Sequence, residues 1–351
     1  MQTFAPQVGH PLTIGLMDSS SRERWDAFVM RHPQATFFHR AGWQHILENH
    51  FGHQTWFLYA ESAGQLRGIL PLAQVRSALF GNTLCSLPFC VYGGIVADDA
   101  AAADCLDREA QALAQRLAVD HLEYRQLEPR HADWHSNPLY ATFRKDLLAD
   151  PDSNLLALPR KQRAMVRKGI AAGLRSSIDS DTGRLYDCYA ASVHRLGTPM
   201  FSRRYFRCVA DTFGNACQVL SVEHGGKAVS AVLSFHFRRQ ILPYYGGGDT
   251  LARQLAANDF MYWEVMRRAC LAGSTLFDFG RSKVGTGSYA FKKNWGFTPQ
   301  PLHYECQLVR ASVLRDLQPL NPRYQLLIRA WRHLPRTLAN AIGPHLVRQL
   351  G

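Results

Sequence analysis

Apolar runs and amphipathic stretches alternate along the first 150 residues of the chain. Residues 54–60 and 66–75 are rich in apolar and aromatic side chains and lie on either side of Gly64, which predicts two strands joined by a turn. Apolar positions recur at helical spacing over residues 100–119, which predicts an amphipathic helix. The same reasoning predicts helices over residues 21–31 and 41–49 and strands over residues 87–96 and 121–127.

A similar order of elements returns in the second half. Strands are expected over residues 219–223 and 228–237, around the Gly225-Gly226 turn, followed by a glycine-rich strand over 241–248. The run ILPYYGGG at 241–248 matches LPFCVYGG at 87–94 in character, and each leads after about 30 residues, through a helix, to a further strand. The later copies are a helix over 258–272 and a strand over 275–279. This predicts an α/β protein of two domains built on one plan, although chance similarity of two α/β segments is the alternative.

The domain boundary is expected at residues 149–153, which are polar and contain a proline. Residues 311–351 form a basic tail broken by prolines, in which arginines alternate with apolar residues between 323 and 348. Such a segment can lie on an anionic membrane or pack its apolar face on its own protein. We favour packing on the first domain, and therefore divide the chain into residues 1–150, 151–310 and 311–351.

Charge and cysteine usage limit the class of protein. The formal net charge of +12 calls for an anionic partner, which leaves nucleic acid, a phosphorylated substrate or an anionic membrane open. The eight cysteines form no CxxC pair, which favours buried, reduced thiols. The N-terminus lacks the pattern of a signal peptide, and no apolar run approaches the ~20 residues of a membrane span. A cytoplasmic protein is expected.

The segment 277–297 holds the most informative candidate chemistry. A buried strand ends at Gly280, and Arg281, Lys283 and the run Gly285-Thr286-Gly287 follow in a loop before the pair Lys292-Lys293. Backbone N–H groups and lysines in such a loop can meet a substrate anion or a developing oxyanion. Asp278, inside the strand, is interpreted as structural, holding the loop that follows. The alternative for the whole segment is a surface loop with scattered positive charge.

A second candidate is the basic helix predicted over residues 158–174. Arg160, Arg163, Arg167 and, less closely, Lys168 share one helical face, and no acidic residue intervenes. Clustered guanidinium groups suit phosphate because they stay charged and donate in pairs. An ordinary solvated helix face is the alternative.

Weaker candidates are a loop before a helix that carries Arg203, and the sequence Tyr245-Gly246-Gly247, where glycines permit close approach of a ligand to the backbone. Either could be a tight turn. His131 and His135 have the spacing of a metal pair, but no accompanying ligand pattern supports them, nor His45, His50 and His53. We therefore predict no structural metal.

Four segments together resemble the FemAB family of peptidyl and aminoacyl transferases. They are LPRKQRAMVRKGIAAGL at 158–174, HRLGTPMFSRRYF at 194–206, YYGGG with AANDFMYWEVMRRACLAGSTLFDFGRS at 244–282, and SYAFKKNWGF at 288–297. The chain is most similar to FemAB-like proteins associated with PEP-CTERM and exopolysaccharide systems of Gram-negative bacteria. The resemblance implies tandem GNAT-like domains, each with a mixed, mostly antiparallel sheet flanked by helices.

The resemblance also implies transfer of an acyl or aminoacyl group to an amine of a cell-envelope or exopolysaccharide precursor. The donor would be aminoacyl-tRNA, acyl-CoA or acyl carrier protein, with no tightly bound cofactor and no DNA partner. The acceptor would be phosphorylated or lipid-linked, so that peripheral contact with the inner membrane is also expected. Two alternatives are a non-catalytic protein that binds nucleic acid in its basic groove and a peripheral membrane protein that acts through its tail.

The family's lysine after a phenylalanine maps onto Lys292, with Lys293 adjacent, and implies stabilisation of the tetrahedral oxyanion. Asp249 and His236 are guesses for a general base. The chain departs from the family in lacking a visible long helical hairpin, and Gly285-Thr286-Gly287 only partly resembles the GNAT pyrophosphate loop. The predicted substrate-binding residues are Arg160, Arg163, Arg167, Lys168, Arg203, Tyr245, Gly246, Gly247, Asn258, Arg281 and Lys283.

Overall fold

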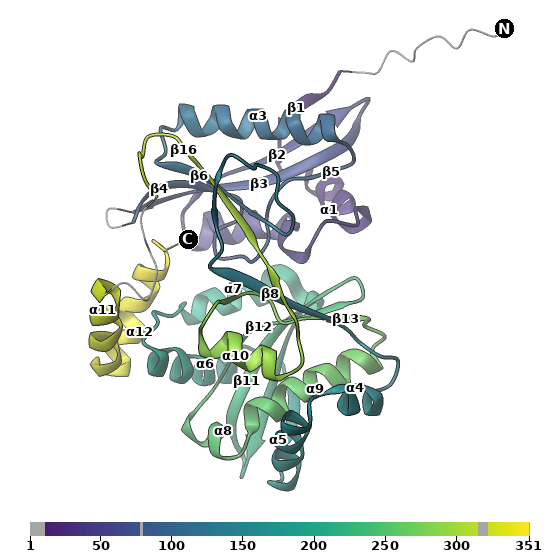
Figure 1. Cartoon of the computed structure of the whole chain (residues 1–351), viewed down its shortest axis with the longest axis vertical. Coiled ribbons are helices and arrows are strands. Elements are labelled where there is room, and N and C mark those ends of the chain that lie inside the picture. Colours follow the sequence, from purple (N-terminus) through teal and green to yellow (C-terminus); the bar gives the residue numbers. More distant parts are fainter. Residues whose placement is uncertain (1–10, 78–79, 315–321, 351) are drawn as a thin grey trace, which may run out of the picture.

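The computed structural model describes residues 11–77, 80–314 and 322–350, which build two mixed sheets, one above the other in Figure 1. In this part of the chain β4 runs parallel to β6, β12 runs parallel to β13, and the other neighbouring strands are antiparallel, as predicted. The first sheet has the order β1 (Thr13–Leu16), β2 (Gln54–Ser62), β3 (Gln65–Ser77), β4 (Gly81–Cys85), β6 (His121–Gln126), β16 (His303–Leu308) and β7 (His135–Asn137), with β5 (Val96–Ala97) beside β3. The second has the order β14 (Ser282–Lys283), β8 (Tyr140–Asp146), β13 (Leu276–Asp278), β12 (Gln240–Gly248), β11 (Lys227–Phe237), β10 (Cys217–His224) and β9 (Arg175–Asp179), with β15 (Pro299–Pro301) beside β8.

Helices cover both sheets and leave a shared core between them. The long helix α3 packs its apolar side on the outer face of the first sheet, and α5 and α9 pack on the outer face of the second. A central aromatic core joins the halves: Phe37 stacks on Phe235 of β11 with ring centroids 4.2 Å apart. The helices are α1 (Arg22–Arg31), α2 (Gly42–His45), α3 (Ala100–Arg116), α4 (Pro151–Ala157), α5 (Arg160–Ala171), α6 (Gly183–Leu196), α7 (Arg203–Phe213), α8 (Thr250–Gln254), α9 (Ala257–Leu271), α10 (Gly287–Asn294), α11 (Pro322–His333) and α12 (Arg336–Val347).

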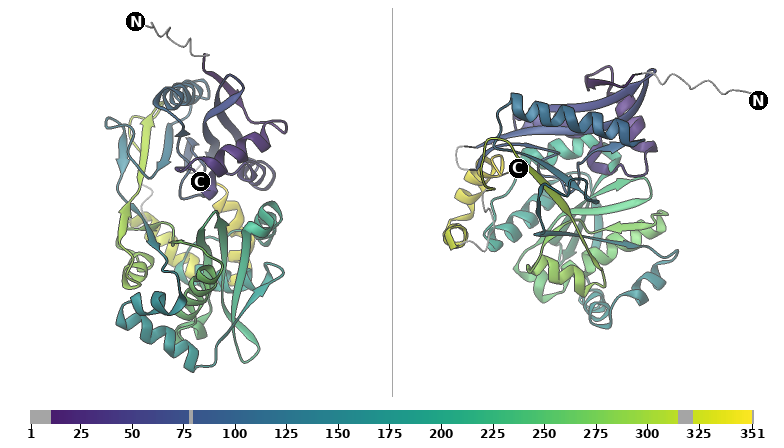
Figure 2. Two further views of the ribbon diagram at one scale, coloured as in Figure 1. Left: turned by 90° about the vertical axis from the view of Figure 1, so that its right-hand side faces the viewer. Right: turned by 45° about the horizontal axis from the view of Figure 1, so that its top comes forward.

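Each half of the chain contributes a strand to the sheet of the other. Strand β8 precedes the predicted boundary at residue 150 yet pairs with β13 of the second sheet, and β16 follows that boundary yet pairs with β6 of the first. Figure 2 shows these crossing strands in the region where the two layers meet. The boundary placed at residues 149–153 therefore does not coincide with the division between the sheets.

The strand predicted over residues 87–96 is wrong, because only Val96–Ala97 pairs with a neighbour in this segment. Leu87 and Phe89 adopt left-handed backbone conformations with φ of 63° and 68° and bury their side chains in the central core. The glycines that follow, Gly93 and Gly94, donate their N–H groups to the carbonyl of Arg125. The buried apolar side chains here stabilise an irregular loop rather than a strand.

The tail packs mainly on α6 of the second half, not on the first domain as expected. The carbonyl of Leu334, between α11 and α12, lies 2.9 Å from Nε2 of His194, and Arg332 donates to the carbonyl of Leu196. Gly197 permits this contact, because a Cβ there would lie 2.6 Å from Ile328. The end of the tail also reaches the first half, where Ser77 is hydrogen-bonded to Gln349.

Two sequence expectations concern what the fold lacks. The eight cysteines are unpaired, as predicted. Among the helices in the described ranges, none combines the length and apolar character needed to cross a membrane.

Candidate functional site

The loop that leaves β13 is fixed at its start by Asp278. One carboxylate oxygen accepts the N–H of Gly280 at 2.7 Å, and the other accepts the hydroxyl of Tyr92 at 3.0 Å. Arg144 Nε lies 3.6 Å from this carboxylate. Burial raises the pKa of Asp278, and the charge of Arg144 opposes that shift. The prediction that Asp278 holds the following loop is confirmed.

Lys292 holds the same loop from the other side. It lies on α10, whose N-terminus is capped by the Thr286 hydroxyl, and its ammonium donates to the carbonyls of Phe279, Gly280 and Arg281 at 2.6, 3.0 and 2.9 Å. Burial lowers the pKa of Lys292 to about 7, whereas the Asp278 carboxylate favours the charged form. An ammonium group has three N–H donors, so these carbonyls use all of them.

Arg281 leaves this loop and lines a cavity of about 440 Å³ to which both halves contribute. Its guanidinium donates to the Tyr304 hydroxyl at 3.0 Å and lies 5.1 Å from the centre of the Tyr140 ring. Within the described ranges Arg281 has no carboxylate partner at ion-pair distance. Lys283 approaches the same Tyr140 ring at 5.6 Å. A half-buried cation without a counter-charge can bind an anion that enters the cavity.

Arg125 is the second arginine of this cavity, and it is neutralised. Its Nε lies 2.7 Å from Glu123, and its Nη1 donates to the carbonyl of Cys90 at 3.1 Å. Arg125 also lines a neighbouring cavity of about 810 Å³, together with Tyr92 and Arg144. Tyr92, the partner of Asp278, thus lines the larger cavity, while Arg281 is the unpaired charge of the smaller one.

The predicted basic helix lies elsewhere. It forms α5, which buries Gln162, Val166 and Gly169 and contacts α9. Arg160, Arg167 and Lys168 are exposed, and Arg163 donates to the Leu156 carbonyl at 3.0 Å. None of these four cations lines either cavity. They form a basic surface remote from the lining of the site.

Tyr245, Gly246 and Gly247 belong to the core of the second half rather than to a cleft. The Tyr245 hydroxyl lies 2.6 Å from that of Tyr205. A Cβ on Gly247 would lie 2.8 Å from Ser192 Cβ of α6, and one on Gly246 would lie 2.9 Å from the Tyr262 hydroxyl. These glycines therefore admit the chain's own side chains, which occupy the space that the sequence assigned to a ligand.

The other predicted residues have local roles. Arg203 forms an exposed ion pair with Asp187 and stacks on Tyr186. Asp249 caps α8 through the N–H of Ala252, and His236 lines a separate small cavity. Lys293 is exposed beside Tyr289, and Asn258, at the start of α9, leaves its buried Oδ1 without a hydrogen-bond partner.

Comparison with known proteins agrees with this architecture. Residues 160–293 match the acetyltransferase (GNAT) domain family. A crystal structure of FemX superposes with a TM-score of 0.67 at 14% identity, over 90% of this chain and 100% of that one. The chain therefore carries a GNAT-type domain over residues 160–293, within an overall fold shared with FemX.

Two further solved structures share this fold. One is the C-terminal domain of a putative lysylphosphatidylglycerol synthetase from Agrobacterium fabrum, with a TM-score of 0.55 and 14% identity over 82% of this chain and 92% of that one. The other is a tandem GNAT protein from the clavulanic acid biosynthesis pathway, with a TM-score of 0.53 and 14% identity over 86% of this chain and 100% of that one. No curated protein matches the sequence significantly.

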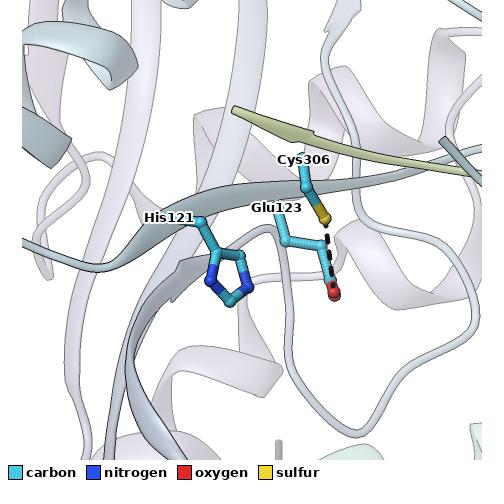
Figure 3. A group of neighbouring side chains, drawn as sticks. All are labelled: His121, Glu123 and Cys306. Carbon is cyan, nitrogen blue, oxygen red and sulfur yellow. Dashed lines mark hydrogen bonds between the residues drawn. The ribbon is translucent and has the colours of Figure 1, made fainter. Parts of the chain in front are cut away.

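Sequence reasoning missed a group of polar side chains that lines the 440 Å³ cavity. Figure 3 shows His121 and Glu123 of β6 beside Cys306 of β16. Cys306 is more than 180 residues from the other two along the chain, so no sequence spacing could have grouped them. The only signal is local: a histidine and a glutamate two residues apart in the strand HLEYRQ, which places both side chains on one face.

Proposed function

We propose that this protein transfers an acyl or aminoacyl group from an activated carrier to an amine of an anionic cell-envelope or exopolysaccharide precursor. The observation that carries the proposal is the unpaired Arg281 in a cavity at the end of the GNAT domain match. Arg281 would bind a phosphate or carboxylate of the acceptor, which fits a net charge of +12.

Surface charge supports an anionic carrier as donor. Arg160, Arg167 and Lys168 lie exposed on α5, with no acidic residue on that helix. The resemblance to the FemAB family implies aminoacyl-tRNA, while acyl-CoA and acyl carrier protein share its negative charge. The name of the lysylphosphatidylglycerol synthetase describes an aminoacylated phospholipid, which supports an envelope component as acceptor.

In the transfer step the amine nitrogen forms a bond to the donor carbonyl, and the bond from that carbonyl to the carrier's oxygen or sulfur breaks. The amine loses a proton, and the departing group takes one up. We assign Lys292 a positioning role, because its three donors hold the carbonyls of Phe279, Gly280 and Arg281. A direct oxyanion role would require the ammonium to release one of these carbonyls.

The test is to incubate the purified protein with labelled acyl-CoA, acyl carrier protein and aminoacyl-tRNA in turn. Each donor is offered amino-sugar acceptors with and without a diphosphate, and product is followed by mass spectrometry. Arg281→Gln should lower kcat/KM for the charged acceptor by roughly 10–100-fold, as expected for one charge-assisted hydrogen bond.

Arg203→Gln is the matched control, because it removes an exposed arginine whose partner is Asp187. It should keep wild-type transfer. Absence of transfer with every donor would contradict the proposed function. Equal losses of kcat/KM in Arg281→Gln for acceptors with and without the diphosphate would contradict the anion-binding role of Arg281 but not the proposed function.

A further inference from the structure

A row of metal-binding side chains crosses four neighbouring strands of the first sheet. Cys85 of β4 lies opposite Glu123 of β6, Glu123 opposite Cys306 of β16, and Cys306 opposite His135 of β7. Side chains at paired positions point to the same face of a sheet, and so does His121, two residues before Glu123. All five line the 440 Å³ cavity.

Three of these residues converge at one point. A ring nitrogen of His121, a carboxylate oxygen of Glu123 and the Cys306 thiol all lie within 4.8 Å of one another. The distances between ligand atoms around a tetrahedral zinc ion are roughly 3.3–3.8 Å, given bond lengths of about 2.0–2.3 Å. A small rotation of the side chains would therefore bring the three groups onto one ion.

Other chemistry for these thiols fits the geometry poorly. Both thiols are buried and lie against the Glu123 carboxylate, the Cys85 sulfur at 3.2 Å and the Cys306 sulfur at 4.0 Å. Among the described residues, neither has a basic group as its hydrogen-bond partner to activate it as a nucleophile. The two cysteines are separated by the whole of β6, about 10 Å across two strand spacings, whereas a disulfide needs Cα atoms within about 7 Å. Neither a reactive thiol nor a disulfide accounts for the cluster.

We propose that His121, Glu123 and Cys306 bind a zinc-like divalent transition metal in the floor of the cavity. Imidazole, thiolate and carboxylate are the ligand types that Zn²⁺ takes, and three protein ligands leave a fourth position open toward the cavity. The inference stands apart from the proposed function, since neither Lys292 nor Arg281 is a ligand.

The charges around the cluster are compatible with such a site. Arg125 Nε binds Glu123 through Oε1, the oxygen that also accepts from Cys85. The other oxygen, Oε2, is left to bind the metal, and it lies 4.0 Å from the Cys306 sulfur. Loss of the thiol proton of Cys306 on binding would add a negative charge to a cavity that two arginines, Arg125 and Arg281, also line.

The experiment titrates the metal-free full-length protein with Co²⁺ alone and then displaces it with Zn²⁺. Wild type should bind one equivalent of Co²⁺ with a near-ultraviolet band from thiolate-to-cobalt charge transfer, which Zn²⁺ abolishes. Cys306→Ser should lose the band, and His121→Ala should weaken binding by more than about 100-fold, beyond the 10–100-fold typical of residues outside the coordination sphere.

Cys217→Ser is the control, since that half-buried thiol lies on β10 of the other sheet. It should keep the band. Circular dichroism verifies the fold of each variant, and His121→Ala tests the site independently if Cys306→Ser does not fold. Wild-type binding no tighter than that of His121→Ala, or loss of the band in Cys217→Ser, would overturn the proposal.

Discussion

The two glycine-tyrosine segments of this protein have similar composition and opposite structures. Residues 241–248 lie in strand β12, which pairs with β11 on both sides of a bulge at Tyr244 and contacts α6. Residues 87–96 form an irregular loop, with Leu87 and Phe89 in left-handed conformations. Helices of the same half pack against residues 241–248. Residues 87–96 lie between the sheets, where the Tyr92 hydroxyl donates a hydrogen bond to Asp278.

This difference shows how a repeated plan can leave a site in one half only. Where the glycines lie in a strand, helix side chains fill the space that they leave, as Ser192 does beside Gly247. Where the backbone is irregular, its polar groups bind Arg125, and Gly94 lines the larger cavity. The larger cavity therefore depends on the loop, since Tyr92, Gly93 and Gly94 line it.

The largest effect is expected at Lys292, which holds the loop that Tyr92 reaches. Lys292→Met should lower the free energy of unfolding by roughly 2–4 kcal/mol, because three carbonyls lose their shared donor. Denaturant unfolding measures this loss, and Lys293→Met, one residue further and exposed, is the control. Equal stability of the two variants would contradict the anchoring role.

The pH dependence of stability provides a second measurement on Lys292. Its pKa falls from 10.5 to about 7 on folding, so the unfolded chain binds more protons between these values. Stability should therefore rise with pH across this window, with a slope of about 1.4 kcal/mol per pH unit from this residue. Lys292→Met should remove that part of the slope, and an unchanged profile would show that the lysine keeps its ordinary pKa.

A matched pair of glycine substitutions compares the packed segment 241–248 with the loop 87–96. A Cβ on Gly247 would lie 2.8 Å from Ser192 Cβ and 3.0 Å from the backbone of α6, so Gly247→Ala should cost roughly 2–3 kcal/mol. A Cβ on Gly94 would lie 2.5 Å from Gln126 Cγ, but its three nearest atoms all belong to that one side chain, which can shift by releasing Glu305. Gly94→Ala should therefore cost roughly 1–2 kcal/mol, less than Gly247→Ala. The unfolding midpoints of the two variants measure these losses. A larger loss in Gly94→Ala than in Gly247→Ala would contradict the difference in packing between the two segments.

Local periodicity was sufficient for the elements that bury one face along a continuous stretch. The strand pair β2–β3 and the helices α3, α5 and α9 lie within a few residues of their predicted places. The expected strand over 87–96 failed because its apolar side chains enter a core made by both halves. Local periodicity could not assign β8 and β16 to their sheets, because each pairs with a strand from the other half of the chain.

The candidate site also contains some residues that the sequence could group and others that only the fold brings together. Arg281, Lys283 and Lys292 were predicted because a strand, a glycine and basic residues follow one another in the chain. Lys292 nevertheless holds backbone carbonyls rather than facing a cavity, which depends on where α10 folds back. Glu123 and Cys306 could not be grouped, because only the register between β6 and β16 brings them together.

The smallest effects compare the tyrosines of the two segments. Tyr92→Phe removes a donor from the buried carboxylate of Asp278 and should cost about 2 kcal/mol, because bonds to charged groups are stronger than neutral ones. Tyr245→Phe removes a neutral bond to the Tyr205 hydroxyl and should cost about 1 kcal/mol. In the transfer assay only Tyr92→Phe should shift the pH profile, because Tyr92 lines the larger cavity and its hydroxyl lowers the pKa of Asp278. An equal shift in Tyr245→Phe would mean that residues 241–248 also influence the titration of the site. It would contradict the proposed difference between the two segments.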